Sequence, residues 1–288
     1  MKNSRKIPFL SFVVSPFKRI KINLSGCNFN CRGCFAIAKD EKGWDFSVSE
    51  LFNFLIKSSK FIYEEIVDDI QLTGGEPTLN AEFLFSLIKK LKEKNIKKIS
   101  ISTNGYLLNK NLVRELKFFD INLIKLDLKA YTDRIHIWYT GKSNKNILKA
   151  IELLCENNLN FYVRTIYIPN IIDCKEIKKI AKFLNKIDKN INYKIYQFAQ
   201  GHSKIPISRH PGKDEMQNAY NIAKEYLNNV SFFTTETAYS PDYKCIEIRC
   251  DNLIEEFERI DEISKKAIDT WYVEYYTFSQ ILKEKIEK

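Results

Sequence analysis

No stretch of this 288-residue chain approaches the roughly 20 uninterrupted apolar residues that a membrane-spanning helix requires. The sequence also lacks internal repeats and low-complexity linkers. Hydrophobic residues make up 44% and aromatic residues 13% of the chain, which is typical of a globular protein of this length. We therefore expect one large core and no membrane partner.

Features of a secreted protein are scarce as well. The first 14 residues begin with basic side chains and continue into an apolar run, but no small-residue cleavage site follows, and Pro16 interrupts the segment. The seven cysteines are an odd number and three of them are grouped, which argues against a secreted disulfide framework and for a reduced compartment. We expect a cytoplasmic protein.

The charge is unbalanced, with 46 basic and 36 acidic residues and a formal net charge of +10. The lysines are scattered over expected helices, as in 89–94 and 175–179, and such runs are usually solvated faces. A basic surface is compatible with binding to a nucleic acid or to an acidic partner. The sequence nevertheless contains no strong nucleic-acid signal.

Strand and helix patterns alternate along most of the chain. This alternation favours βα units around a parallel sheet, so we expect an α/β fold. The expected strands lie near 19–24, 68–73, 98–102, 122–128, 160–168 and 193–198, and the expected helices near 48–62, 81–95, 109–118, 144–158, 173–187 and 214–228. A turn pattern predicts a boundary near residue 240, which would separate a core, 1–240, from a C-terminal extension, 241–288.

Three cysteines follow the first expected strand, in the run Gly26-Cys27-Asn28-Phe29-Asn30-Cys31-Arg32-Gly33-Cys34. Three thiolates can hold three corners of a cubane iron–sulfur cluster and leave one iron open to another ligand. A zinc site is the alternative. Structural zinc takes four Cys or His ligands, however, and the nearest histidine in the sequence is His136.

A second motif, Gly74-Gly75-Glu76-Pro77, follows the apolar segment 70–73. Two glycines allow a backbone to approach a ligand closely, and proline is tolerated where the next helix begins. Alone, this motif is more often a structural turn. Both motifs follow expected strands, and in barrels of βα units the active residues lie at those carboxyl ends.

Three charged residues interrupt two otherwise apolar segments, namely Asp127, Lys129 and Arg164. A buried charge is costly unless it is paired or bound to a ligand. An internal salt bridge is one explanation. Their repeated placement on the face expected to be active favours contact with an ionic ligand, and the polar run Ser102-Thr103-Asn104-Gly105 follows another expected strand.

Together, the cysteine run and Gly74-Gly75-Glu76-Pro77 resemble the motifs of the radical S-adenosylmethionine (SAM) enzymes. The resemblance implies a partial (βα)6 TIM-like barrel, with a [4Fe–4S] cluster on Cys27, Cys31 and Cys34 and SAM as the second cofactor. The segments 126–130, 140–144 and 164–169 further resemble the glycyl-radical-enzyme activating branch, the relatives of pyruvate formate-lyase activating enzyme. This similarity extends from about Arg19 to Tyr226.

The resemblance also implies the SAM site. The residues expected to hold SAM or a nearby cation are Gly74, Gly75, Glu76, Pro77, Ser102, Asn104, Asp127, Lys129 and Arg164. Three departures from the pattern concern Gly33, where most members have an aromatic residue, Ser102, where an acid helps to bind a cation, and Gln200, where a histidine is often met.

The implied activity is that of a radical SAM oxidoreductase, which reductively cleaves SAM to a 5′-deoxyadenosyl radical for hydrogen abstraction. The resemblance also implies a flavodoxin- or ferredoxin-type reductant and a glycyl radical enzyme as the partner. The alternative is a radical SAM enzyme that modifies a small metabolite, a nucleoside or a peptide. A non-catalytic iron–sulfur or zinc binding module is a third possibility.

Several other residues are expected to have no role in the site. The four remaining cysteines and two of the histidines belong to this group, namely Cys155, Cys174, Cys245, Cys250, His136 and His210. We expect both histidines to lie at the surface or to be hydrogen-bonded. The aromatic segment 271–278 has a spacing that predicts a helical face packed on the barrel, with a docking surface as the alternative.

Overall fold

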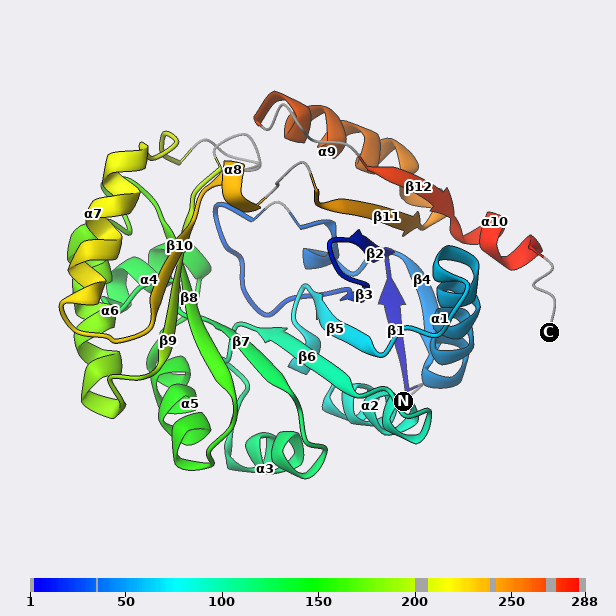
Figure 1. The fold of residues 1–288 in the computed structure, drawn as a ribbon, viewed down its shortest axis with the longest axis horizontal. Helices are drawn as coiled ribbons and strands as arrows, with labels where there is room; N and C mark the ends of the chain where they lie inside the picture. The colour runs from blue at the N-terminus through cyan, green and yellow to red at the C-terminus, as the bar shows by residue number, and fades with distance from the viewer. Residues whose placement is uncertain (1–2, 35, 200–206, 239–241, 268–272, 285–288) are drawn as a thin grey trace.

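The computed structural model describes residues 3–34, 36–199, 207–238, 242–267 and 273–284. Its strands form a curved ten-stranded sheet, and most helices lie along the outer face of the curve (Figure 1). The strands are β1 (Ser4–Ile7), β2 (Phe9–Ser15), β3 (Arg19–Leu24), β4 (Trp44–Ser47), β5 (Asp69–Gly74), β6 (Lys98–Thr103), β7 (Leu123–Asp127), β8 (Phe161–Tyr167), β9 (Asn192–Gln197), β10 (Val230–Phe233), β11 (Lys244–Arg249) and β12 (Glu274–Thr277). The helices are α1 (Val48–Tyr63), α2 (Ala81–Glu93), α3 (Lys110–Phe118), α4 (Asp133–Thr140), α5 (Lys145–Glu156), α6 (Cys174–Ile187), α7 (Lys213–Lys224), α8 (Thr235–Ala238), α9 (Ile254–Ala267) and α10 (Phe278–Lys283).

The large sheet has the strand order β10-β9-β8-β7-β6-β5-β3-β2-β11-β12. The strands from β10 to β3 all run parallel, while β2 is antiparallel to both of its neighbours. A separate two-stranded sheet joins β1 to β4. The parallel strands β3, β5, β6, β7, β8 and β9 are each followed by helices, which confirms the expected α/β fold and its partial (βα)6 barrel.

Side chains of β3 alternate between the hydrophobic core under the helices and the cavity inside the barrel. Ile20 and Ile22 are buried in the main hydrophobic core, whereas Lys21 and Asn23 line an interior cavity. Successive side chains of a strand point to opposite faces, so one face packs on helices and the other remains polar. At α1, the hydroxyl of Ser47 caps the helix and completes a capping box with Glu50.

The segment 9–15 is the main element that sequence patterns did not predict as a strand. The sequence analysis rejects a signal peptide here and assigns the run to no strand or helix; it forms β2, in the sheet between β3 and β11, where Leu10, Phe12 and Val13 are fully buried. A short apolar run is found both in signal peptides and in buried strands, so its composition does not distinguish the two. None of the helices in the described part of the chain is long and apolar enough to cross a membrane.

The C-terminal segment adds two strands to the same sheet, because β11 pairs with β2 and β12 pairs with β11. The predicted helical face is therefore wrong for 274–277, which are β12. Packing on the barrel is confirmed, since Tyr276 contacts Phe61 with ring centroids 5.1 Å apart, and Phe278 is fully buried. Trp271 and Tyr272 lie outside the described residues, and the division near 240 stays a prediction.

Candidate active site

Four turns meet at the carboxyl edge of the parallel sheet. β3 ends just before the cysteine run, β5 ends at Gly74, β6 ends at Thr103 and β7 ends at Asp127. These strands are parallel neighbours in the sheet, so the loops that follow them lie side by side. The two motifs that the sequence analysis grouped are thus adjacent in space.

The cysteine loop is anchored on the last turn of α4. The backbone N–H groups of Asn30 and Arg32 donate to the carbonyl oxygens of Thr140 (2.8 Å) and Tyr139 (2.9 Å). Arg32 Nε donates to the carbonyl oxygen of Trp138 at 2.9 Å. Carbonyl groups in the last turn of a helix lack partners within the helix. The end of α4 therefore supplies a row of acceptors that sets the path of the loop.

The three thiols of this loop are half-buried, and they carry no disulfide. Burial raises the pKa of Cys27 to about 11 and that of Cys31 to about 12. The charge of Cys34 raises the pKa of both thiols and that of Cys27 raises the pKa of Cys31, while the Lys129 ammonium favours the thiolate of both. Cys31 and Cys34 line a cavity of about 370 Å³. The loop is therefore a group of interacting sulfur donors.

The donor set fits an iron–sulfur cluster. In the described residues, no three Cys, His, Asp or Glu side chains are gathered as ligands of one metal ion. A cubane binds each thiolate through a different iron, so its protein ligands are spread around a cluster and not around one point. Soft thiolate ligands of this kind select such clusters.

The glycine motif packs directly on the start of the cysteine loop. Gly75 N donates to the carbonyl oxygen of Leu24 (2.8 Å), and Glu76 N donates to that of Gly26 (2.7 Å). A Cβ atom at Gly75 would collide with the carbonyl oxygens of Gly26 and Ala38. Glycine at this position is therefore required by the close approach of two backbones.

The carboxylate of Glu76 holds this turn to the end of β6. Its Oε1 accepts hydrogen bonds from the backbone and hydroxyl of Thr78 and from the hydroxyl of Thr103 (2.7 Å), and its Oε2 accepts one from Asn104 N (2.7 Å). The side chain is fully buried, and burial raises its pKa, although these donors act in the opposite direction. Glu76 therefore joins two of the four turns.

The side chain of Asn104 extends this connection to the cysteine loop. Its Nδ2 donates to Asn28 Oδ1 at 2.7 Å and lies 3.8 Å from Cys27 Sγ. Ser102 lies one layer deeper, where its hydroxyl accepts from Gln71 Nε2 at 2.9 Å. Gln71 in turn accepts from Lys125, whose pKa is lowered to about 7, mainly by burial and then by nearby cations.

A compact ion cluster lies beside these turns. Asp127 forms ion pairs with Arg164 and, at 3.1 Å, with Lys129 Nζ. Burial alone would raise the pKa of Asp127, but Arg164 and Lys129 hold it below its usual value. Asp127 likewise raises the pKa of Lys129 against the effect of burial. All three groups are therefore charged in the folded protein.

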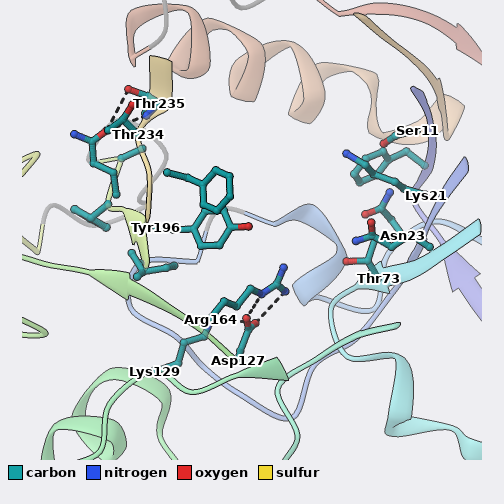
Figure 2. Close-up of a pocket in the computed structure, with 18 residues that line it drawn as sticks. Ser11, Lys21, Asn23, Thr73, Asp127, Lys129, Arg164, Tyr196, Thr234 and Thr235 are labelled. Atoms are coloured by element: carbon teal, nitrogen blue, oxygen red, sulfur yellow. Dashed lines mark hydrogen bonds and ion pairs between the residues drawn. The ribbon is translucent and has the colours of Figure 1, made fainter. Parts of the chain in front are cut away.

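The ion cluster lines an interior cavity of about 540 Å³, which is drawn in Figure 2. Gly33 of the cysteine loop lines the same cavity, so the cysteine loop and the ion cluster share one interior space. A Cβ at Gly33 would lie 2.8 Å from the hydroxyl oxygen of Tyr139 and 3.2 Å from the ring of Phe198. An aromatic residue at this position would not fit without rearrangement of these rings.

A family profile described as the Radical SAM superfamily matches residues 24–184, more than half of the chain. The chain belongs to the radical SAM superfamily. It is therefore an enzyme of the radical SAM class, and the matched range includes the cysteine loop and the strands β5 to β8.

Relatives of this radical SAM chain include activating enzymes. A candidate glycyl-radical enzyme activating enzyme of Methanocaldococcus jannaschii is 35% identical over 222 residues, which cover 76% of this chain and 82% of that protein. A pyruvate formate-lyase-activating enzyme of Staphylococcus epidermidis is 28% identical over 196 residues, covering 65% and 77%. The solved structure of a radical SAM methyltransferase from Sphaerobacter thermophilus has the same fold, with a TM-score of 0.61 at 13% identity, covering 79% and 73%.

The candidate site contains residues that sequence patterns did not single out. Lys21 and Asn23 line the cavity from β3, and the sequence analysis assigns them no role in the site. The alternating polar residues of this strand could have predicted their position. When helices cover one face of a strand, its other face points into the barrel. His136 is fully buried, and its ring is hydrogen-bonded to the carbonyl oxygen of Lys142 at 2.7 Å, so it is the hydrogen-bonded histidine that was one of the two expectations. Gln200 lies outside the described residues.

Replacing Gly75 by Ala should destabilise the protein by about 1–3 kcal/mol, the usual cost of forcing atoms into a packed site. The reason is the collision with the carbonyl oxygens of Gly26 and Ala38. Chemical unfolding of the wild type and variant measures the difference. Gly212→Ala is the matched control, since its added Cβ meets only Glu215 Oε2 at 3.7 Å. Equal stability of Gly75→Ala and Gly212→Ala would contradict the packing described here.

Replacing Asp127 by Asn should lower the stability at pH 7 by about 3 kcal/mol, because the ammonium of Lys129 and the guanidinium of Arg164 lose their common partner. The pKa of Asp127 is lowered in the folded protein. Its contribution is therefore complete above the unfolded pKa and is lost as the pH falls through the folded pKa.

Unfolding measured from pH 7 down to about pH 2 tests this dependence, because the contribution of Asp127 is lost only below the ordinary pKa of an aspartate. The gap between wild type and Asp127→Asn should be widest at neutral pH and should narrow toward the acid end. Asp68→Asn is the control, because Asp68 is exposed. A gap that stays constant, or that is as large for Asp68→Asn, would show that the charge of Asp127 is not responsible.

Proposed function

We propose that this radical SAM enzyme binds a [4Fe–4S] cluster through Cys27, Cys31 and Cys34, and that it activates a glycyl radical enzyme. When bound and reduced, the cluster supplies the electron that splits SAM into methionine and a 5′-deoxyadenosyl radical. The radical takes a hydrogen atom from a backbone glycine of the partner, which yields 5′-deoxyadenosine and a glycyl radical. A flavodoxin- or ferredoxin-type protein supplies the electron.

The observation that carries the proposal is the connection between the cysteine loop and the glycine motif. Asn104 bonds to Asn28 and approaches the sulfur of Cys27, and its own backbone N–H is held by Glu76. A ligand of the open iron would thus lie beside Gly74–Pro77. We assign the amino end of SAM to this turn, with Glu76 as the group that keeps the turn in position.

The ion cluster supports binding of the SAM carboxylate. Arg164 and Lys129 share the single negative charge of Asp127, so one positive charge is left over on the cavity wall. Removal from water strengthens the attraction of such a charge for a carboxylate. The pairs also fix the orientation of the Arg164 and Lys129 side chains before the ligand arrives.

The activase assignment rests on the relatives, and in particular on the protein that is 35% identical over 76% of this chain. A radical SAM enzyme acting on a small metabolite, a nucleoside or a peptide remains the alternative. The two differ in the donor of the hydrogen atom, which the second experiment below identifies.

Anaerobic reconstitution with iron and sulfide should load about four irons and four sulfides per chain, as one cubane requires. Combined replacement of Cys27, Cys31 and Cys34 by Ala should abolish this loading, since no thiolate of the loop then remains. Iron and acid-labile sulfide assays with the absorption spectrum give the measurement. The control with Cys245 and Cys250 replaced by Ala should keep the full iron content. Retention of the cluster in the triple variant would refute the assignment.

With SAM and dithionite, the reconstituted enzyme should produce 5′-deoxyadenosine and methionine. Incubated with the glycyl radical enzyme encoded nearest to its gene, carrying α-deuterated glycine, it should place one deuterium in 5′-deoxyadenosine and generate a glycyl radical signal in electron paramagnetic resonance. Deuterium from a labelled small metabolite, and none from a protein glycine, would favour the alternative. S-Adenosylhomocysteine as the main product would refute hydrogen abstraction.

A further inference from the structure

The three cysteines of the loop differ in the hydrogen bonds that reach their sulfur atoms. Cys27 Sγ accepts from the backbone N–H of Phe29 at 3.4 Å and from the side-chain amide of Asn104, whose Nδ2 lies 3.8 Å away. Within the described residues, no hydrogen bond is donated to the sulfur of Cys31 or of Cys34. One of the three expected cluster ligands is thus distinguished from the other two.

The amide of Asn104 is held so that its nitrogen faces this sulfur. Its Oδ1 accepts from Tyr106 N at 3.0 Å, and its Nδ2 donates to Asn28 Oδ1 at 2.7 Å as well as to Cys27. The backbone N–H of Asn104 donates to Glu76 Oε2 at 2.7 Å, and the residue is only 6% exposed. An inverted amide would place its oxygen against Asn28 Oδ1 and its nitrogen against the N–H of Tyr106. The partners on both sides therefore fix the direction of the donor.

A further contact of Cys27 does not oppose this arrangement. Cys27 Sγ lies 4.0 Å from Asn28 Oδ1, to which the thiol proton is donated. A cysteine that binds iron has lost this proton, because metal ligands of this kind are thiolates. The contact with Asn28 Oδ1 therefore ends when Cys27 becomes a ligand, whereas both N–H donors remain.

Donors at a ligand sulfur favour the reduced state of an iron–sulfur cluster, because the added electron increases the negative charge on the sulfur atoms. The free thiol shows the same effect, since the N–H of Phe29 lowers the pKa of Cys27 against the effect of burial. The charges of Glu76 and Lys129 act on this pKa in opposite directions. Water is largely excluded from Asn104, and a hydrogen bond is electrostatically stronger in such surroundings.

We propose that Asn104 tunes the reduction potential of the cluster, by donating a hydrogen bond from its side-chain amide to the sulfur of Cys27. The inference rests on the proposed function, because it requires a cluster on Cys27, Cys31 and Cys34. The amide stabilises the reduced state, and so it eases the uptake of one electron from the flavodoxin- or ferredoxin-type reductant. Asn104 acts through Cys27, which makes it a positioning residue.

Asn104→Ser tests this role in the reconstituted enzyme. Serine keeps an oxygen that can accept from Tyr106 N, but its shorter side chain has no N–H to offer to Cys27. A potentiometric titration without SAM, followed by the electron paramagnetic resonance (EPR) signal of the reduced cluster, gives the midpoint potential. Loss of one hydrogen bond should reduce the ratio of reduced to oxidised cluster about threefold to tenfold at a fixed potential, which lowers the midpoint by about 28–59 mV for a one-electron couple.

Three other variants separate the hydrogen bond from a purely structural role. Asn104→Asp keeps the size of the side chain and the acceptor for Tyr106 N, but it places an oxygen where the donor was, so the potential should fall at least as far. Asn28→Ala removes the contact between Asn104 and the loop but leaves the donor to Cys27, so the potential should stay almost unchanged. Asn109→Ser removes the amide that caps α3 and should behave as the wild type. An unchanged potential in both Asn104 variants, or an equal fall in Asn28→Ala, would overturn the proposal.

The wild type offers a second measurement that does not depend on the folding of a variant. With ¹⁵N in the side-chain amide of asparagine, pulsed EPR of the reduced cluster should show a coupling to ¹⁵N, because a hydrogen bond to a ligand sulfur carries spin density to the donor nitrogen. The coupling should persist in Asn28→Ala and disappear in Asn104→Ser. A wild-type cluster without any amide coupling would contradict the proposed hydrogen bond.

These measurements and SAM cleavage fail independently. A cluster whose potential depends on Asn104, in an enzyme that cleaves no SAM, would refute the proposed function alone. SAM cleavage by an enzyme whose potential is the same in both Asn104 variants would refute this inference alone. Failure to load a cluster on the three cysteines, which the iron and sulfide assays detect, would refute both.

Discussion

The buried carboxylate of Glu76 is the contact on which the site depends most. It accepts hydrogen bonds from Thr78, Thr103 and Asn104, so that one side chain fixes the turn after β5 against the turn after β6. Asn104 then bonds to Asn28 in the cysteine loop. A fully buried carboxylate is tolerated only because these donors satisfy it. Loss of this group would leave several buried donors without acceptors and would loosen both turns.

Two backbone constraints complete this arrangement. Gly75 permits the glycine motif to touch the start of the cysteine loop, and the carbonyl groups at the end of α4 hold the middle of that loop. None of these contacts involves a thiol. The loop is thus held by hydrogen bonds of its backbone and of the Asn28 and Arg32 side chains, and its sulfur atoms remain available as ligands.

The interior of the barrel is unusually charged for a protein core. Asp127, Arg164 and Lys129 neutralise one another in part, and Ser102, Gln71 and Lys125 form a hydrogen-bonded chain beneath them. Such groups are costly to bury, and their cost is offset only by pairing or by a bound ligand. The salt bridge and the ligand contact that the sequence left as alternatives are compatible, because the ion cluster both pairs internally and lines the cavity.

Local patterns were sufficient for much of this protein. The βα alternation, the ends of β3, β5 and β6, the cysteine spacing and the glycine motif all depend on neighbours within a few residues, and these features are found at the predicted positions. The segments 9–15 and 274–277 were missed as strands because their place in the sheet comes from pairing with distant strands. An apolar or aromatic run does not reveal which distant segment it will pair with.

The sequence by itself determined which residues follow the parallel strands, since that depends on the order of elements along the chain. Only the tertiary structure decided which of these residues touch. It showed that Glu76 bonds to Thr103, that Ser102 turns toward Gln71, and that Lys21 and Asn23 face the ion cluster across one cavity. The physical reason is that hydrogen bonds and burial depend on sheet curvature and strand register, which bring together residues that are far apart in the sequence.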